Sequence, residues 1–129
     1  MKKGYLSLDK LEVYQLSREL SKIAWEIYDT LDWKNKKIIG DQFITAADSV
    51  GANVAEGFGR FHYLDKVKFY FNARGSLLES RHWLEILNER KMVFSQAKKK
   101  FLRCYQNLRP ALNGLIDSTM KAKENQPLP

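Results

Sequence analysis

A block in the middle of the chain, residues 41–77, constrains the fold more than any other part of the sequence. It holds two segments with the apolar spacing of core helices, yet small and polar residues recur through both. An amphipathic helix normally presents one broad apolar stripe and leaves its other positions to solvent. Here a second row, which we call the polar ladder, shares one helix face at steps of three or four residues: Gln42, Thr45, Ser49, Asn53, Glu56 and Arg60.

The chain of 129 residues fits one compact domain, or one protomer of an oligomer, and can bury a core without disulfides or metals. Its single cysteine, Cys104, cannot form an intramolecular disulfide, which fits a reducing compartment. No charged leader and no apolar run long enough for a membrane span is seen. We therefore expect a soluble cytoplasmic protein with a domain over residues 1–123 and a disordered tail over 124–129.

Positive charge is distributed unevenly along the chain. The 22 Lys and Arg residues outnumber the 15 Asp and Glu residues, which gives a formal net charge of +7. Residues 92–129 carry much of this excess, whereas residues 1–33 are slightly acidic. A one-sided positive potential attracts polyanions, nucleic acid foremost, although a basic face can also serve only to keep a protein in solution.

Four stretches have helical periodicity, and strand-like alternation is absent. Asp9 and Ser95 are the expected N-caps of the first and last helices, and Pro110 is expected to kink or break the last one near residues 106–109. Short connections favour antiparallel neighbours, so we predict an all-α, antiparallel up-down-up-down four-helix bundle. The predicted helices span residues 9–31, 37 to 57 or 58, 63–90 and 95–121, with 33–36 as the first connection.

Glycines interrupt the second and third predicted helices. A glycine inside a helix costs about 0.5–1 kcal/mol relative to alanine, so its presence needs a packing reason. We predict that Gly51, Gly57 and Gly75 are points of close approach by another helix, and Gly57 also suits a helix end.

The polar ladder has three interpretations. We favour a paired polar network between helices or subunits, because buried polar groups must find partners. A solvated polar face is the second interpretation, and a catalytic pair of Glu56 and Glu79 is the third. No nucleophile and no oxyanion donor lies at a sequence spacing typical of a catalytic site. We therefore expect that the protein is not an enzyme. The predicted network comprises Ser49, Asn53, Glu56, Asn72, Ser76 and Glu79.

The histidines and the cysteine show no pattern typical of a metal or nucleophile site. His62 and His82 are far apart in sequence, and no Cys or carboxylate cluster has the spacing of metal ligands. Cys104 lies on an apolar stripe, where we expect an inert, buried thiol. We predict no catalytic residue, no metal and no cofactor.

One long motif stands out in the central block. It is the run Gln42-x-x-x-Ala46-Ala47-x-Ser49-Val50-Gly51-x-Asn53-Val54-Ala55-Glu56-Gly57, then Arg60, then Gly75-Ser76-Leu77-x-Glu79. This motif closely resembles a family of small four-helix-bundle proteins encoded in intervening sequences of bacterial 23S rRNA genes. The resemblance covers about residues 8–118, and Leu11-x-Val13-Tyr14-Gln15 and Ile27-Tyr28 are similar to the family's first helix.

The resemblance implies a four-helix bundle that assembles into a ring-like pentamer. It also implies kinship with the accessory variability protein of diversity-generating retroelements, a basic pentamer that associates with nucleic acid and with a reverse transcriptase. No settled biochemical activity comes with the family. The chain departs from the family pattern at Phe61-His62-Tyr63, where serines are common, and at Pro110.

Two functional hypotheses follow. In the first, a homo-oligomer, pentameric as the resemblance implies, binds RNA or DNA through basic side chains. Three adjacent lysines near a helix N-terminus interact unfavourably with the helix dipole. Their presence there indicates that this surface has a function other than stabilising the helix. In the second, Tyr14, Trp25 and Tyr28 dock a protein such as a reverse transcriptase or a ribosome-associated factor; neither hypothesis involves a membrane. The predicted nucleic-acid-binding residues are Lys98, Lys99, Lys100, Arg103, Arg109 and Arg60.

Overall fold

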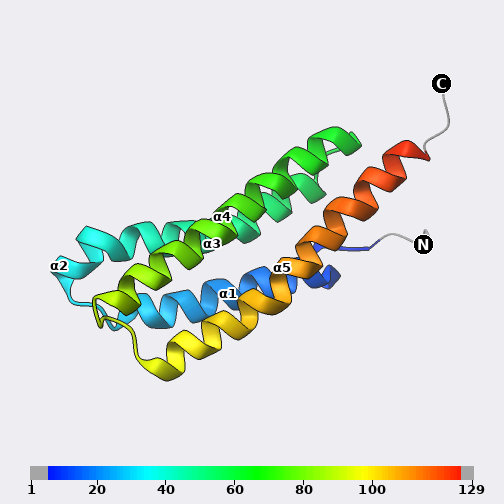
Figure 1. Ribbon diagram of the computed structural model, residues 1–129. Helices are drawn as coiled ribbons and strands as arrows, with labels where there is room; N and C mark the ends of the chain where they lie inside the picture. The colour runs from blue at the N-terminus through cyan, green and yellow to red at the C-terminus, as the bar shows by residue number, and fades with distance from the viewer. Residues whose placement is uncertain (1–5, 126–129) are drawn as a thin grey trace.

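The computed structural model describes residues 6–125, and every regular element in that range is helical (Figure 1). Consecutive long helices run in opposite directions. Contacts join α1 to α3, α3 to α4, α4 to α5 and α5 to α1, so these helices surround one core. The predicted all-α four-helix bundle is confirmed. Its elements are η1 (Leu8–Lys10), α1 (Glu12–Asp29), α2 (Trp33–Asn35), η2 (Lys36–Gly40), α3 (Asp41–Phe58), α4 (Tyr63–Glu89) and α5 (Ser95–Glu124).

The core is formed by the apolar stripes of the four long helices. Phe43 of α3 and Phe101 of α5 are fully buried, and their ring centroids lie 5.5 Å apart. Leu20 of α1 and Tyr70 of α4 are buried in the same cluster. Full burial of a Leu or Phe side chain contributes about 1.5–3 kcal/mol to folding, so these stripes explain why the amphipathic segments assemble.

Small residues close the contact between α1 and α3, which we call the α1–α3 seam. A Cβ added at Gly51 would lie 3.4 Å from the Cβ of Ser17. The Ser17 hydroxyl is satisfied inside its own helix, donating to the Val13 carbonyl at 2.7 Å. One turn further on, the Ser21 hydroxyl donates to the Ala47 carbonyl across the seam at 3.4 Å. The two backbones can approach because nothing larger stands between them.

The other two predicted close-packing glycines differ from each other. A Cβ at Gly57 would lie 2.7 Å from the Tyr70 ring, so α3 ends directly against α4. Lys66 closes that end, because its Nζ donates to the Phe58 carbonyl at 2.8 Å. At Gly75 nothing lies within 4 Å of the Cβ position. The close approach of another helix predicted at Gly75 is therefore not seen within the described residues 6–125.

The start of the first helix and the first connection differ from the prediction. Asp9 lies within η1, and the N-cap of α1 is Leu11, which makes no side-chain capping bond. The predicted connection over 33–36 is helical instead. The Asp32 carboxylate accepts the backbone N–H of Asn35 at 2.8 Å and starts a helical turn that continues into α3.

The last helix also differs from the prediction at both ends and in its middle. Its N-cap is Phe94, and Ser95 is the first helical residue. The helix continues through Pro110 without a break and ends at Glu124, inside the predicted tail. The rest of that tail, residues 126–129, lies outside the described residues. Between residues 6 and 125, no helix combines the length and the apolarity needed to cross a membrane.

Candidate nucleic-acid interface

Three hollows lie along α4 and α5, two of which share Tyr105, Arg109 and Asn113, and we call the three together the α4–α5 groove. The α5 residues that line them recur every three or four positions and therefore lie on one face of that helix. The α4 residues that line them do the same on the facing edge. The lining residues are Ser95, Lys98, Lys99, Leu102, Tyr105, Gln106, Arg109, Pro110 and Asn113 on α5, Arg74, Leu77, Leu78, Arg81 and Asn88 on α4, and Lys91 and Val93 between them.

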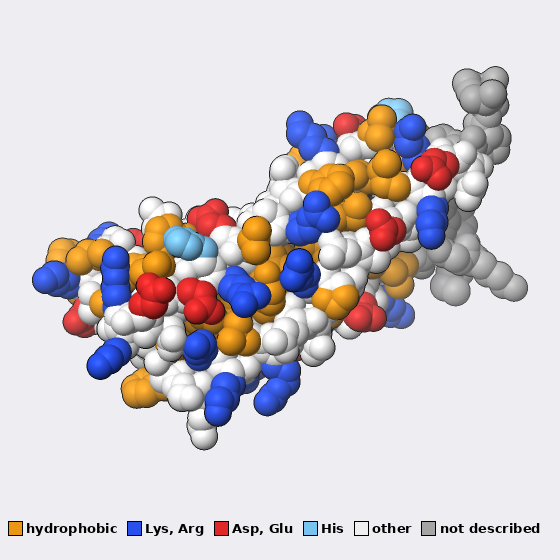
Figure 2. All heavy atoms as spheres, viewed as in Figure 1, with side chains coloured by type: hydrophobic (Ala, Val, Ile, Leu, Met, Phe, Trp, Pro, Cys, Tyr) orange, Lys and Arg blue, Asp and Glu red, His pale blue; other side chains and the backbone are white. Residues whose placement is uncertain are grey.

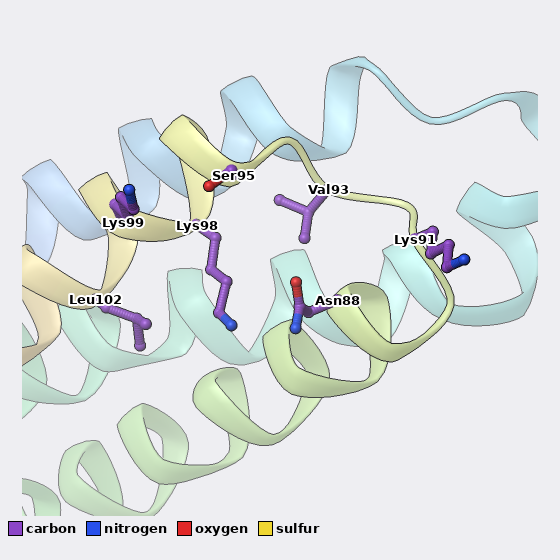
Figure 3. Close-up of a pocket in the computed structure, with 7 residues that line it drawn as sticks. All are labelled: Asn88, Lys91, Val93, Ser95, Lys98, Lys99 and Leu102. Atoms are coloured by element: carbon purple, nitrogen blue, oxygen red, sulfur yellow. The ribbon is translucent and has the colours of Figure 1, made fainter.

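The end hollow lies where the α4–α5 connection meets the first turns of α5. It has a volume of about 420 Å³. Figure 3 shows Lys98 and Asn88 pointing into the same space from opposite helices, with Lys91 and Lys99 at its rim. The half-buried Lys98 ammonium and the amide of Asn88 give this hollow hydrogen-bond donors, which suits an anion.

Lys91 holds its place at the rim through a helix-ending motif. Its N–H bonds the Asn88 carbonyl at 3.0 Å, and the N–H of Met92 bonds the Leu87 carbonyl at 2.8 Å. This Schellman pattern requires a left-handed residue, usually glycine. Lys91 adopts it with φ 59°, at a cost of about 1–2 kcal/mol. A lysine therefore occupies a position where glycine is more stable.

Arginines line the other two hollows, whose volumes are about 440 Å³ and about 150 Å³. Arg109 and the buried Tyr105 line both. Arg81 lies over the Tyr105 ring, with its guanidinium carbon 5.1 Å from the ring centroid. Arg74 donates from Nη1 to the Asn113 side-chain oxygen at 3.1 Å. These contacts hold the planar guanidinium groups in fixed orientations at the groove wall.

The groove is strongly basic. Six of its lining residues are Lys or Arg, and none is Asp or Glu. The half-buried Glu85 stands on α4 between Arg81 and Asn88, but it does not line the hollows. Figure 2 shows Lys and Arg side chains spread over this face of the molecule, among exposed hydrophobic side chains and several Asp and Glu side chains. A lining that carries only positive side-chain charges attracts anions.

The structure places three of the six predicted cations in this groove, namely Lys98, Lys99 and Arg109. Arg103 is exposed and lines none of the three hollows. The remaining two cations make contacts elsewhere on the surface.

Lys100 and Arg60 each pair with a carboxylate outside the groove. Lys100 lies 3.3 Å from the Glu26 carboxylate of α1. Arg60 pairs with Glu56 one turn earlier in the chain, and its guanidinium lies 4.7 Å from the centroid of the Phe69 ring. Exposed pairs of this kind contribute little to stability, but they leave less net charge at these two positions.

Sequence reasoning missed Arg74, Arg81 and Lys91, which also line the groove. A signal was present, because residues 74, 81 and 88 recur every seven positions and share one helix edge. The sequence alone does not reveal that this edge of α4 faces the basic edge of α5.

The polar ladder makes its hydrogen bonds within each helix. The Ser49 hydroxyl donates to the Thr45 carbonyl at 2.7 Å, and the Asn53 amide donates to the Ser49 carbonyl at 2.9 Å. Glu79 accepts from the indole N–H of Trp83 at 3.0 Å, and Glu56 pairs with Arg60 as described above. Between residues 6 and 125, no hydrogen bond joins these α3 residues to Asn72, Ser76 or Glu79. A network that includes both helices would need a second chain.

The fold and the groove define a small, basic four-helix-bundle protein with a cationic channel along one helix pair. The chain belongs to the 23S rRNA-intervening sequence protein family, whose sequence profile matches residues 9–114. In fold it is similar to a crystal structure of a protein with unknown function from the S23 ribosomal protein family of Bacteroides thetaiotaomicron. The TM-score is 0.75 at 19% identity, over 81% of this chain and 97% of that one. Comparison with curated proteins finds no match.

Proposed function

We propose that this protein is a non-catalytic, homo-oligomeric nucleic-acid-binding protein whose α4–α5 groove contacts the phosphate backbone. One observation carries the proposal: six cationic side chains and no carboxylate line the three hollows of this groove. Neutralising phosphates releases condensed counterions and favours binding without regard to sequence. The family's link to ribosomal RNA genes supports RNA as the first polymer to test.

A salt series tests this proposal. Filter binding of a labelled RNA to the full chain should give a log affinity that falls linearly with log salt concentration. The slope should be about −0.7 to −0.9 for each phosphate neutralised. A flat plot, or no binding at low salt, would contradict the proposal.

Self-association is supported by large apolar side chains left exposed around the end of α1 and the start of α3. Trp25 is 55% exposed, Trp33 76% and Ile38 54%. Exposed apolar surface of this kind is typical of interaction sites. We propose that further copies of the chain cover it, in the pentamer that the family resemblance implies. Each copy would repeat the groove, and linked weak sites bind a long polyanion more tightly than one site does.

Light scattering of the purified chain measures its oligomeric state directly. The proposal expects a mass several times the 15.1 kDa of one chain at micromolar concentration. A mass of one chain under those conditions would remove the oligomer from the proposal and leave the groove to be judged by the salt series alone.

A protein adaptor is the second candidate function. Trp25 stacks on Tyr28 with ring centroids 5.3 Å apart, and Tyr14 lies about three turns earlier on the same helix with Arg18 over its ring. This aromatic line could dock a reverse transcriptase or a ribosome-associated factor instead of another copy. A pull-down that still recovers a protein after nuclease treatment would favour the adaptor, and loss of every partner after that treatment would contradict it.

A further inference from the structure

Flat, π-bonded groups occur in or near the hollows of the α4–α5 groove. Phe94 does not itself line the end hollow, but it is 73% exposed and lies in the chain between Val93 and Ser95, which do. At the middle hollow, the guanidinium of Arg81 lies over the Tyr105 ring. At the third hollow, the guanidinium of Arg74 lies over the Phe71 ring, 4.7 Å from its centroid.

The guanidinium groups of Arg81 and Arg74 lie over aromatic rings, and both arginines are exposed. A guanidinium that rests on a ring uses one face for that contact and leaves the other face free. The hydrogen bond from Arg74 to Asn113 adds a second restraint on that plane. Because both arginines are exposed and neither is in an ion pair within residues 6–125, their outer faces are accessible to a ligand.

Nucleic acids differ in what they can place against such surfaces. The bases of a single strand can be unstacked and laid on aromatic rings or on arginine planes. In a duplex the base faces are hidden, and only phosphates and groove edges are available. A channel that alternates cations with flat surfaces therefore fits a single strand better than a duplex.

We propose that the α4–α5 groove binds single-stranded RNA or DNA. Lys98, Lys99 and Arg109 meet the phosphates, while unpaired bases stack on Phe94 and on the guanidinium planes of Arg81 and Arg74. This inference rests on the proposed function and deepens it, because it names the form of nucleic acid that the groove takes. A duplex can use only the charges of the groove.

Fluorescence anisotropy with one labelled oligonucleotide, as a single strand and annealed to its complement, tests the inference on the full chain. Arg81→Lys keeps the charge and removes the plane, and Phe94→Ala removes the ring. Each change should weaken single-strand binding about tenfold and leave duplex binding unchanged. Arg18→Lys, at an arginine that lies over the Tyr14 ring, and Phe61→Ala are matched controls on exposed residues outside the groove, and both should bind as the wild-type chain does.

The possible results separate the two proposals. Equal affinity for single strand and duplex, together with wild-type binding by Arg81→Lys and Phe94→Ala, would overturn the single-strand inference and leave a groove that recognises charge alone. Equal losses in the controls would also overturn it, because the stacking surfaces would then not be those of the groove. Binding of neither form by the wild-type chain would overturn the proposed function as well.

Discussion

The α1–α3 seam and the α4–α5 groove are both contacts between neighbouring antiparallel helices, yet one is closed and the other is open. At the α1–α3 seam the facing residues are Gly51, Ala47, Ser17 and Ser21, and the backbones approach closely. Along the groove the facing positions carry long Lys and Arg side chains, whose charged ends must stay hydrated. The size and charge of seam residues, more than helix geometry, decide where this bundle leaves room for a ligand.

The face of α5 that packs on α1 belongs with the closed contacts, and Cys104 reports on it. Burial, together with the nearby Glu19 charge, raises the pKa of this thiol from 9.0 to about 12. Near pH 8 the folded chain should therefore hold about a thousandfold less thiolate than the unfolded chain. Alkylation of Cys104 should be slow in buffer and fast in denaturant; equal rates would show that this contact is open.

The raised pKa also predicts how Cys104 affects stability as the pH changes. The folded state keeps the thiol proton to a higher pH than the unfolded state does. The contribution of Cys104 is therefore fully present below about pH 9 and is lost as the pH rises toward 12. Urea denaturation at several alkaline pH values should show less alkaline loss of stability in Cys104→Ala than in the wild-type chain.

Filling the closed seam should cost more than filling an open position. Gly51→Leu forces a branched side chain against Ser17 and should lower the free energy of unfolding by about 1–3 kcal/mol. Gly75→Ala is the control, because its Cβ meets nothing within 4 Å, and it should raise stability by about 0.5–1 kcal/mol. Urea melts measure both; a tolerated Gly51→Leu would mean that the seam is looser than described.

Removing charge from the groove should affect binding and leave the fold intact. The double change Lys98→Ala and Lys99→Ala should reduce the salt slope of nucleic-acid binding by about two and weaken affinity about tenfold. Lys100→Ala is the control, since Lys100 pairs with Glu26 outside the groove. If Lys100→Ala lost as much affinity for each charge removed as the double variant, the three lysines would contribute equally to binding, and the groove would have no special role.

Lys91 allows a smaller test, in which stability and binding should move in opposite directions. Glycine adopts the left-handed conformation freely, so Lys91→Gly should stabilise the fold by about 0.5–1 kcal/mol. The same change removes a cation from the end hollow and should reduce the salt slope by about one. Lys91→Asn tolerates the same backbone and loses the same charge, so its slope should match; unchanged slopes in both would exclude Lys91 from the interface.

Much of the fold could be predicted from the sequence, because apolar spacing states directly which face of a helix is buried. The buried row from Val13 to Ile27 and the location of Lys98 and Lys99 on α5 are examples. The groove could not be predicted to the same extent, since its lining depends on which edges of two helices meet. Arg74 and Arg81 of α4 belong to the groove because they line its hollows together with residues of α5.

Two predictions from local sequence rules were wrong, namely the N-cap at Asp9 and the break at Pro110. Asp9 has the chemistry of an N-cap, yet it lies in the short turn before α1, where its carbonyl accepts from the Gln15 side chain at 3.0 Å. Pro110 lacks an N–H, so it leaves the Gln106 carbonyl without its helical partner. Gln106 and Pro110 are both exposed at the α4–α5 groove, where water can solvate the Gln106 carbonyl. The helix α5 therefore continues past Pro110.

Every residue that lines the α4–α5 groove falls between positions 74 and 113, within a single helical hairpin. No residue of α1 or α3 lines the three hollows. If the proposed oligomer forms through α1 and α3, the contacts between copies would therefore leave the lining of each groove accessible to nucleic acid.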